Sequence, residues 1–231
     1  MRRSAAIGPV LVLCCLLAWP VRATQAPVTL QSRIAANGDG EAILNNQSAV
    51  SLTAYVFEVL REPCNPAQAR ERILRGYDAR TAPDGKTVPP FGLRTENLGV
   101  SHCNKTGVHA SARALLRAAL FADGTKYGEK EFAEILLRHR EWQLQRIDGV
   151  IRALKSGLER KITREEYVAL LKERQVSLRE SKDDSPPVEF ADVDPWETAL
   201  RQLTAKAAGP LPAQIEETLA VLSAMRNKVA E

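Results

Sequence analysis

The stretch that decides the fold runs from Ser51 to Leu60 and reads Ser-Leu-Thr-Ala-Tyr-Val-Phe-Glu-Val-Leu. In an extended chain successive side chains point to opposite faces, so each face can be read separately. One face carries Leu52, Ala54, Val56 and Leu60, interrupted by Glu58, and the other carries Thr53, Tyr55, Phe57 and Val59. A strand that is apolar on both faces belongs in the middle of a sheet covered on both sides. We therefore expect an opposing sheet on one face and another layer on the other.

The segments around this strand also read as β structure. Residues 28–35 and 41–44 are two expected strands, separated by the turn sequence Asn-Gly-Asp-Gly. Residues 93–100 predict a further strand. The stretch 108–121 is ambiguous, since its alanines favour a helix but its apolar residues alternate with period two. We predict a strand there, followed by a hairpin turn at Asp123-Gly124.

Two segments interrupt this pattern. Pro66 followed by apolar residues up to Leu74 predicts a short helix that Gly76 ends. Residues 88–91 contain a Pro-Pro pair, which is suited only to an edge strand or a loop.

From Glu129 onward the spacing of apolar residues becomes helical. A long amphipathic helix is expected to run close to Gly157. Thr163-Arg164-Glu165-Glu166 is a capping-box pattern that starts a second helix, which should end near Leu178. Asp194-Pro195 starts a third helix, and a fourth begins near Ala213. This helical half is the expected cover for the sheet that contains Tyr55, with Phe132 and Ile151 pointing toward the β layer.

The first 23 residues have the layout of a secretory signal peptide. Two arginines precede an apolar run that Pro20 ends, and the predicted cut falls after Ala23. The alternatives are an uncleaved N-terminal anchor and a lipoprotein built on Cys14 or Cys15, although Leu13 is too large for a lipid-modification signal. No later stretch approaches the ~20 apolar residues of a membrane span. We expect a periplasmic or secreted protein.

The net charge does not indicate a nucleic-acid partner. The whole chain carries 32 basic and 28 acidic residues, but three of the bases and none of the acids lie in residues 1–23. The mature chain would have a net charge of about +1, which supports binding neither to nucleic acid nor to an anionic membrane.

Two of the four cysteines, Cys64 and Cys103, lie beyond the signal segment. Two cysteines in an exported protein most simply form a disulfide. The alternative is two reduced thiols too far apart to meet.

Motifs of enzymatic or metal chemistry are missing from the sequence. There is no G-x-S-x-G elbow, no phosphate-binding glycine loop and no H-E-x-x-H pattern. The three histidines His102, His109 and His139 lack the spacing of a metal site, and we interpret them as surface or half-buried residues. No metal and no cofactor is predicted.

Three further features allow two interpretations each. Residues 129–180 hold twelve Lys or Arg and ten Asp or Glu, which we interpret as a solvated, balanced face rather than a nucleic-acid or lipid surface. Trp142 and Trp196 fall within apolar stripes, as core residues or as aromatic anchors for a partner. Asn46 and Asn104 match the glycosylation pattern, which is equally expected by chance in turn-rich sequence.

Two motifs resemble a group of exported bacterial proteins of uncharacterised function. Asn45-Asn46-Gln47-Ser48 followed by residues 52–56 resembles their "N-N-S … T-A-Y-V" strand pair, and residues 119–128 resemble their "F-x-D-G-T-x-x-G" hairpin before an arginine-rich helix. The resemblance covers residues 40–155. It implies an immunoglobulin-like sandwich beside a helical region in a bacterial cell envelope, and it brings no activity or site.

The sequence thus predicts an α+β protein with a small antiparallel β-sandwich and a helical C-terminal region. The expected divisions are a signal peptide (1–23), the sandwich (24–128), a helical hairpin packing on the sheet (129–180), a linker (181–193) and C-terminal helices (194–231). The favoured function is a non-enzymatic binding or scaffolding protein whose partner is an unknown protein or envelope component. The alternatives are an envelope hydrolase with a site not visible in the sequence, and self-association through the long helix.

Overall fold

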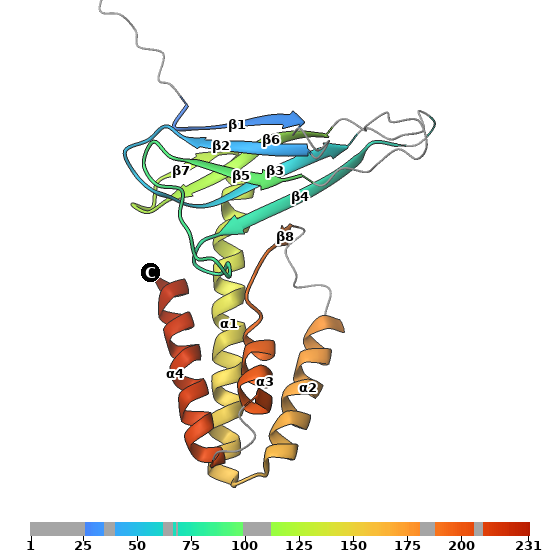
Figure 1. Cartoon of the computed structure of the whole chain (residues 1–231), viewed down its shortest axis with the longest axis vertical. Helices are drawn as coiled ribbons and strands as arrows, with labels where there is room; N and C mark the ends of the chain where they lie inside the picture. Colours follow the sequence, from blue (N-terminus) through green and yellow to red (C-terminus); the bar gives the residue numbers. More distant parts are fainter. Residues whose placement is uncertain are drawn as a thin grey trace, which may run out of the picture.

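Two mostly antiparallel sheets and four helices make up the protein, as seen in a computed structural model that describes residues 26–34, 40–61, 67, 69–98, 112–180, 188–205 and 210–231. The three-stranded sheet has the order β1-β2-β5 and the five-stranded sheet the order β7-β6-β3-β4-β8 (Figure 1). Among the strands of the described residues, only β4 and β8 pair in parallel. The strands are β1 (Val28–Ile34), β2 (Gly40–Asn46), β3 (Leu52–Arg61), β4 (Glu71–Asp78), β5 (Leu93–Asn97), β6 (Ala112–Phe121), β7 (Lys126–Gly128) and β8 (Glu189–Phe190).

Strand β3 lies in the middle of the larger sheet, between β4 and β6, as its two apolar faces predict. Tyr55 and Val59 face the core between the two sheets. Ala54 and Val56 face the other side, where Leu136 of the first helix packs on them. Both faces of the strand are therefore covered, the second of them by the beginning of the first helix.

The ambiguous stretch 108–121 is a strand in its described part, since residues 112–121 form β6. Ala118 pairs with Val56 of β3 across the sheet, which gives the small residues of β6 a buried position. The hairpin turn that follows is confirmed, with Gly124 at a φ of 84°. The short strand β7 after it was not predicted.

The predicted helix between Pro66 and Gly76 is wrong, because residues 71–78 form β4. This strand pairs with β3 along its whole length. Ile73 packs into the core between the sheets, whereas Leu74 packs on the opposite side with Phe190. The two apolar residues Ile73 and Leu74 thus point to opposite faces of the sheet. Pairing with β3 outweighs the local helical pattern of this segment.

The four helices are α1 (Lys130–Arg160), α2 (Arg164–Glu180), α3 (Pro195–Ala205) and α4 (Leu211–Ala230). The predicted caps are in place. The backbone N–H of Thr163 donates to the Glu166 carboxylate at 2.6 Å, and the backbone N–H of Trp196 donates to Asp194 Oδ1 at 2.8 Å. Between α1 and α2, Lys161 takes a left-handed conformation with φ 54° and turns the chain back.

The helices stand away from the sheets instead of lying flat along them (Figure 1). Only the first part of α1, including Leu136, packs on the five-stranded sheet. Its later residues form a separate core with α2, α3 and α4. The expectation that Ile151 faces the β layer is wrong, because Ile151 packs in this helical core. Phe132 does face the sheet, as predicted.

The expected end of α1 near Gly157 is three residues early. A Cβ at Gly157 would overlap the ring of Tyr167 in α2, so this glycine allows the close approach of the two helices. The cost of a glycine inside a helix is offset by the burial of Tyr167, whose hydroxyl donates to the Leu154 carbonyl at 3.0 Å.

Candidate functional site

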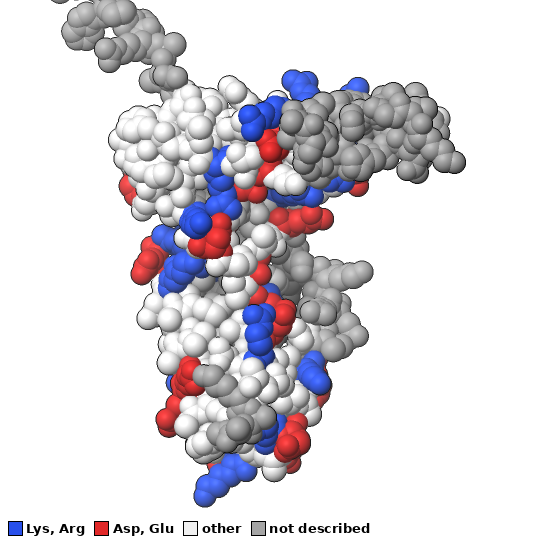
Figure 2. All heavy atoms as spheres, viewed as in Figure 1, with Lys and Arg blue, Asp and Glu red and all other residues white. Residues whose placement is uncertain are grey.

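Most charged side chains at the junction of the sheets and the helices are paired. Figure 2 shows basic and acidic groups interspersed on the face in view. In the five-stranded sheet, buried Glu58 accepts from Arg72 at 2.5 Å and from Arg117 at 3.0 Å. These hydrogen bonds, that of Arg72 first, hold the pKa of Glu58 below its ordinary value against the opposing effect of burial. Glu58, which interrupts the apolar pattern of β3, is therefore part of a structural ion pair.

A second buried pair attaches α1 to the sheets. Arg140 of α1 donates to both carboxylate oxygens of Asp78, with Nε–Oδ2 at 2.6 Å and Nη2–Oδ1 at 3.2 Å. Its Nη2 also lies 3.2 Å from Thr53 Oγ1 in β3. The Asp78 side chain has no exposed surface. A buried, bidentate pair of this kind fixes the orientation of the helix on the sheet.

His139 is buried, contrary to the expectation of a surface or half-buried histidine. Its Nε2 lies 3.1 Å from Asp192 Oδ1, and its ring stacks on Phe190 with the ring centroids 3.6 Å apart. Burial would raise the pKa of Asp192, but hydrogen bonds from His139, Thr81 and Gln143 hold that pKa below its ordinary value. The pair lies beside Phe190 of β8 and lines none of the described cavities.

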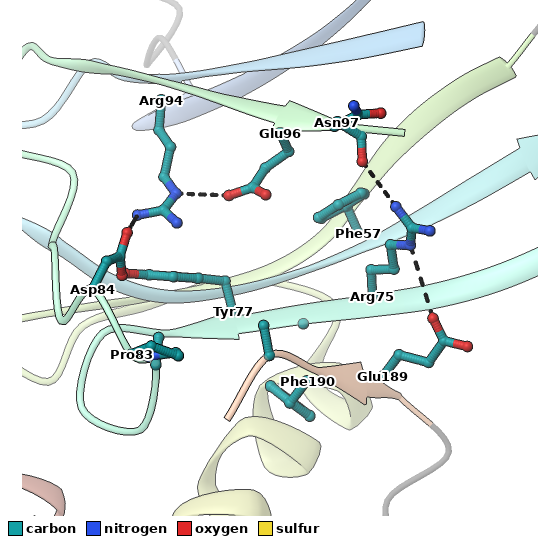
Figure 3. A pocket seen from close by; sticks show the side chains of 13 residues that line it. Phe57, Arg75, Tyr77, Pro83, Asp84, Arg94, Glu96, Asn97, Glu189 and Phe190 are labelled. Atoms are coloured by element: carbon teal, nitrogen blue, oxygen red, sulfur yellow. Dashed lines mark hydrogen bonds and ion pairs between the residues drawn. The ribbon is translucent and has the colours of Figure 1, made fainter. Parts of the chain in front are cut away.

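The first candidate cavity lies between the edges of the two sheets and has a volume of about 500 Å³ (Figure 3). Arg94 of β5 extends over the ring of Tyr77, with its Cζ 3.6 Å from the ring centroid. Its guanidinium also donates to Glu96 at 2.6 Å and pairs with Asp84 at 3.3 Å. Tyr55 donates to the same Glu96 from inside the core.

The polar groups of this cavity are already satisfied by one another. Burial raises the pKa of Tyr77 to about 12, with a further rise from its hydrogen bond to Asp84. Arg75 donates to the Asn97 carbonyl at 2.8 Å and pairs with Glu189 at 3.9 Å (Figure 3). A ligand here would have to break these contacts. The arrangement therefore holds the two sheet edges together.

The second candidate cavity is a groove between α1, α2 and α3, with a volume of about 590 Å³. This size is within the range of ~300–1,000 Å³ typical of ligand sites. We call it the helical groove. It is lined by Trp142, Gln145, Arg146, Gly149, Arg152, Ala153, Ser156 and Arg160 of α1, Leu170 and Arg174 of α2, and Trp196 of α3.

The helical groove has four arginines and no acidic residue in its lining. Arg146 is paired with Asp194 at 3.0 Å and stacks over Trp142, with its Cζ 4.6 Å from the ring centroid. Arg152 and Arg174 are exposed and have no acidic partner in the part of the chain that the structure describes. The groove therefore offers positive charge that the described residues leave uncompensated.

The groove also contains polar hydrogens without acceptors. Trp196 is 4% exposed, and its indole Nε1 is buried with no hydrogen-bond partner among the described residues. The Nε of Arg146 is in the same situation. Buried donors are normally satisfied, so these two leave hydrogen-bonding capacity unmet in residues that line the groove.

Of the residues singled out from the sequence, Trp142 and Trp196 lie together in the helical groove. The prediction of Cys64 and Cys103 as a disulfide lies outside the described residues, as do His102, His109 and Asn104. The strands flanking the two cysteine segments are close, however. Arg61 pairs with Ala112 and donates to the Leu98 carbonyl at 2.9 Å, so both segments start from one end of the sheets.

The glycosylation pattern at Asn46 belongs to a structural residue. Its side-chain amide is buried and donates to the carbonyls of Val50, Val88 and Pro89 at 2.9–3.1 Å. These bonds fix the loop that exposes Phe91 at a φ of 55°. In the folded protein this nitrogen is not accessible for modification.

Sequence reasoning missed the arginines of the groove. Residues 129–180 contain nearly equal numbers of basic and acidic residues. The two kinds are distributed unequally, because the acids of α1 mostly lie on faces other than the one that lines the groove. The spacing of Arg146, Gly149, Arg152, Ala153, Ser156 and Arg160 at intervals of three and four was the available signal. It indicates one face of a helix that is basic and partly small.

No group of three or more His, Cys, Asp or Glu residues in the described part of the chain could hold a metal ion. Within the same residues, no helix is both long and apolar enough to cross a membrane. Comparison with models of known protein families, with curated proteins and with solved structures gives no match for this chain.

Proposed function

We propose that this chain is an exported, non-enzymatic binding protein of the cell envelope and that the helical groove is its binding site. The observation that carries this proposal is the groove itself. Two tryptophans lie there beside Arg152 and Arg174, which have no acidic partner among the described residues. The buried acids Glu58 and Asp78 and the half-buried Asp192 are engaged in ion pairs or hydrogen bonds. Positive charge and aromatic surface that folding leaves unpaired are typical of a binding site.

The two packed sheets support the immunoglobulin-like part of the proposal. The strands β1, β2 and β5 form one sheet, and β7, β6, β3 and β4 follow one another in the second. Constant-type immunoglobulin domains place strands A, B, E and D in one sheet and C, F and G in the other, and the described residues form no counterpart of D. The present order fits that scheme when β4 is taken as a strand added beside the third one.

Export is part of the proposal and rests on the N-terminal residues. With a positively charged start, an apolar run and a cut after Ala23, the mature chain would begin at Thr24 and would be periplasmic or secreted. N-terminal sequencing of the protein from cell envelopes and from the medium tests this. A chain that keeps Met1 and stays in the cytoplasm would contradict it.

The binding function is tested by affinity capture from the native envelope. The wild-type chain and a Trp142→Ala variant are compared, with Leu137→Ala as the matched control, since Leu137 is an exposed apolar residue of the same helix outside the groove. We expect a partner that is lost with Trp142→Ala and kept with Leu137→Ala. Equal capture by all three chains would place the binding site elsewhere. Turnover of an envelope substrate by the purified chain would favour the hydrolase instead.

A further inference from the structure

The arginines of the helical groove are spread along its length. Arg146 is paired with Asp194, but Arg152 and Arg160 are eight residues apart on α1, which corresponds to about 12 Å along the helix axis. Arg174 lies on α2. A single phosphate or sulfate ion cannot reach both ends of such a row. A ligand that uses the whole groove must carry several negative charges at intervals.

The kind of negative charge follows from the residues present. All four basic residues of the lining are arginines, although the two helices also contain lysines. The planar guanidinium binds a carboxylate through two parallel N–H···O bonds, which a lysine ammonium cannot do. The guanidinium pairs with phosphate in the same bidentate way, so the groove matches a row of oxyanions, of which carboxylates are those that an unmodified polypeptide carries.

The floor of the groove calls for an apolar or aromatic group between those carboxylates. Trp142 is half-buried, and Gly149 and Ala153 leave space along the adjacent α1 surface. A Cβ added at Gly149 would meet the Trp196 ring at 3.5 Å. Aromatic anchors in such recesses carry much of the energy of protein–protein contacts.

The shape excludes the flat polyanions. A bilayer surface cannot reach the floor of a groove between three helices. A nucleic acid would need a broad basic surface, and a groove between three helices is too narrow to admit a duplex. A peptide is narrow enough to enter and carries carboxylates and rings on one chain.

We infer that the helical groove binds an acidic peptide segment of a partner protein, with its carboxylates on Arg152 and Arg174 and an aromatic or apolar side chain against Trp142. This inference rests on the proposed binding function of the same groove. The binding mode is that of a peptide laid along a helix-lined groove.

The tryptophans provide the test. The chain has three, Trp19, Trp142 and Trp196, so in a full chain carrying Trp19→Phe all indole emission comes from the groove. The probe is a random copolymer of glutamate and tyrosine, titrated at low salt with excitation that tyrosine does not absorb. We expect a saturable change in emission. Polyglutamate without tyrosine should bind more weakly, because it lacks the aromatic contact.

The decisive variant carries Arg152→Glu and Arg174→Glu. Its matched control carries Lys155→Glu and Lys172→Glu, which change the net charge equally on the same two helices at exposed positions outside the groove. We expect Kd to rise at least about tenfold for the arginine variant and less than about threefold for the control. Circular dichroism of both variants confirms that they are folded. An equal loss in both would reduce the effect to net charge and overturn the inference.

Two further arms separate the sources of negative charge. Inorganic phosphate or vesicles of phosphatidylglycerol that reproduce the response, with the same dependence on Arg152 and Arg174, would overturn the peptide assignment. If the copolymer fails while envelope capture still depends on Trp142, the acidic-peptide inference falls and the binding function stands. If capture does not depend on Trp142 either, both fall.

Discussion

The ion pair between Asp78 and Arg140 should contribute more to stability than any other described contact between the sheets and the helices. In Asp78→Asn, the guanidinium of Arg140, whose side chain is 12% exposed, loses its charged partner but keeps its charge. Breaking one side of a buried pair costs about 3–5 kcal/mol, because a desolvated charge is left behind. With a urea dependence of about 2 kcal/mol per M for a protein of this size, the unfolding midpoint should fall by about 1.5–2.5 M.

The assay is urea unfolding followed by tryptophan emission and by circular dichroism. The first signal reports the helices through Trp142 and Trp196, and the second reports the whole fold. Glu197→Gln serves as the control, since it removes an exposed pair with Arg201 and should change the free energy of unfolding by less than about 1 kcal/mol.

A double-mutant cycle isolates the pair itself. Asp78→Asn, Arg140→Gln and the double variant should give a coupling free energy between about 1 and 3 kcal/mol. Additive effects, or a single-variant loss as small as that of the Glu197 control, would refute the reasoning that this pair joins the two halves.

Three other predictions concern pH, packing and oxidation. The lowered pKa of Glu58 stabilises the fold above the ordinary carboxyl value, and this contribution is lost as pH falls through the folded-state pKa; acid unfolding of Glu58→Gln should therefore be flatter than that of wild type below about pH 4.5, and parallel curves would refute this. Gly157→Ala should destabilise by about 1–3 kcal/mol because a methyl group meets the tyrosine ring of α2, whereas Gly149→Ala on the same helix has room and should stabilise by up to about 1 kcal/mol in thermal melts; the same sign for both would refute the packing argument. Peptide mapping without reductant should give Cys64 and Cys103 as one cross-linked pair, and their joint replacement by serine should cost about 4 kcal/mol; free thiols in both peptides would contradict the disulfide.

The central strand was predictable because its pattern does not depend on its neighbours. Two apolar faces over the ten residues 51–60 require cover on both sides, whatever provides it. The alternation in residues 112–121 is equally local, and so are the caps at Thr163 and Asp194. Each of these patterns lies within a single segment, so it can be read without knowledge of the tertiary structure.

Strand β4 and the helical groove were not predictable in the same way. Residues 71–78 become a strand because β3 offers a full-length partner, which no local pattern contains. The groove depends on how α2 returns along α1 after the left-handed turn at Lys161. The turn at Lys161 and the close approach of α2 at Gly157 decide which face of α1 stays open. The direction in which α2 packs on α1 cannot be read from the spacing of apolar residues alone.

Helix α1 runs without a break from the five-stranded sheet to the far end of the other three helices, a length of about 46 Å for 31 residues. It belongs to both cores at once, and Arg140 attaches it to Asp78 of the sheet. A change that displaces α1 in the helical core would therefore also displace Leu136 from its packing on the five-stranded sheet.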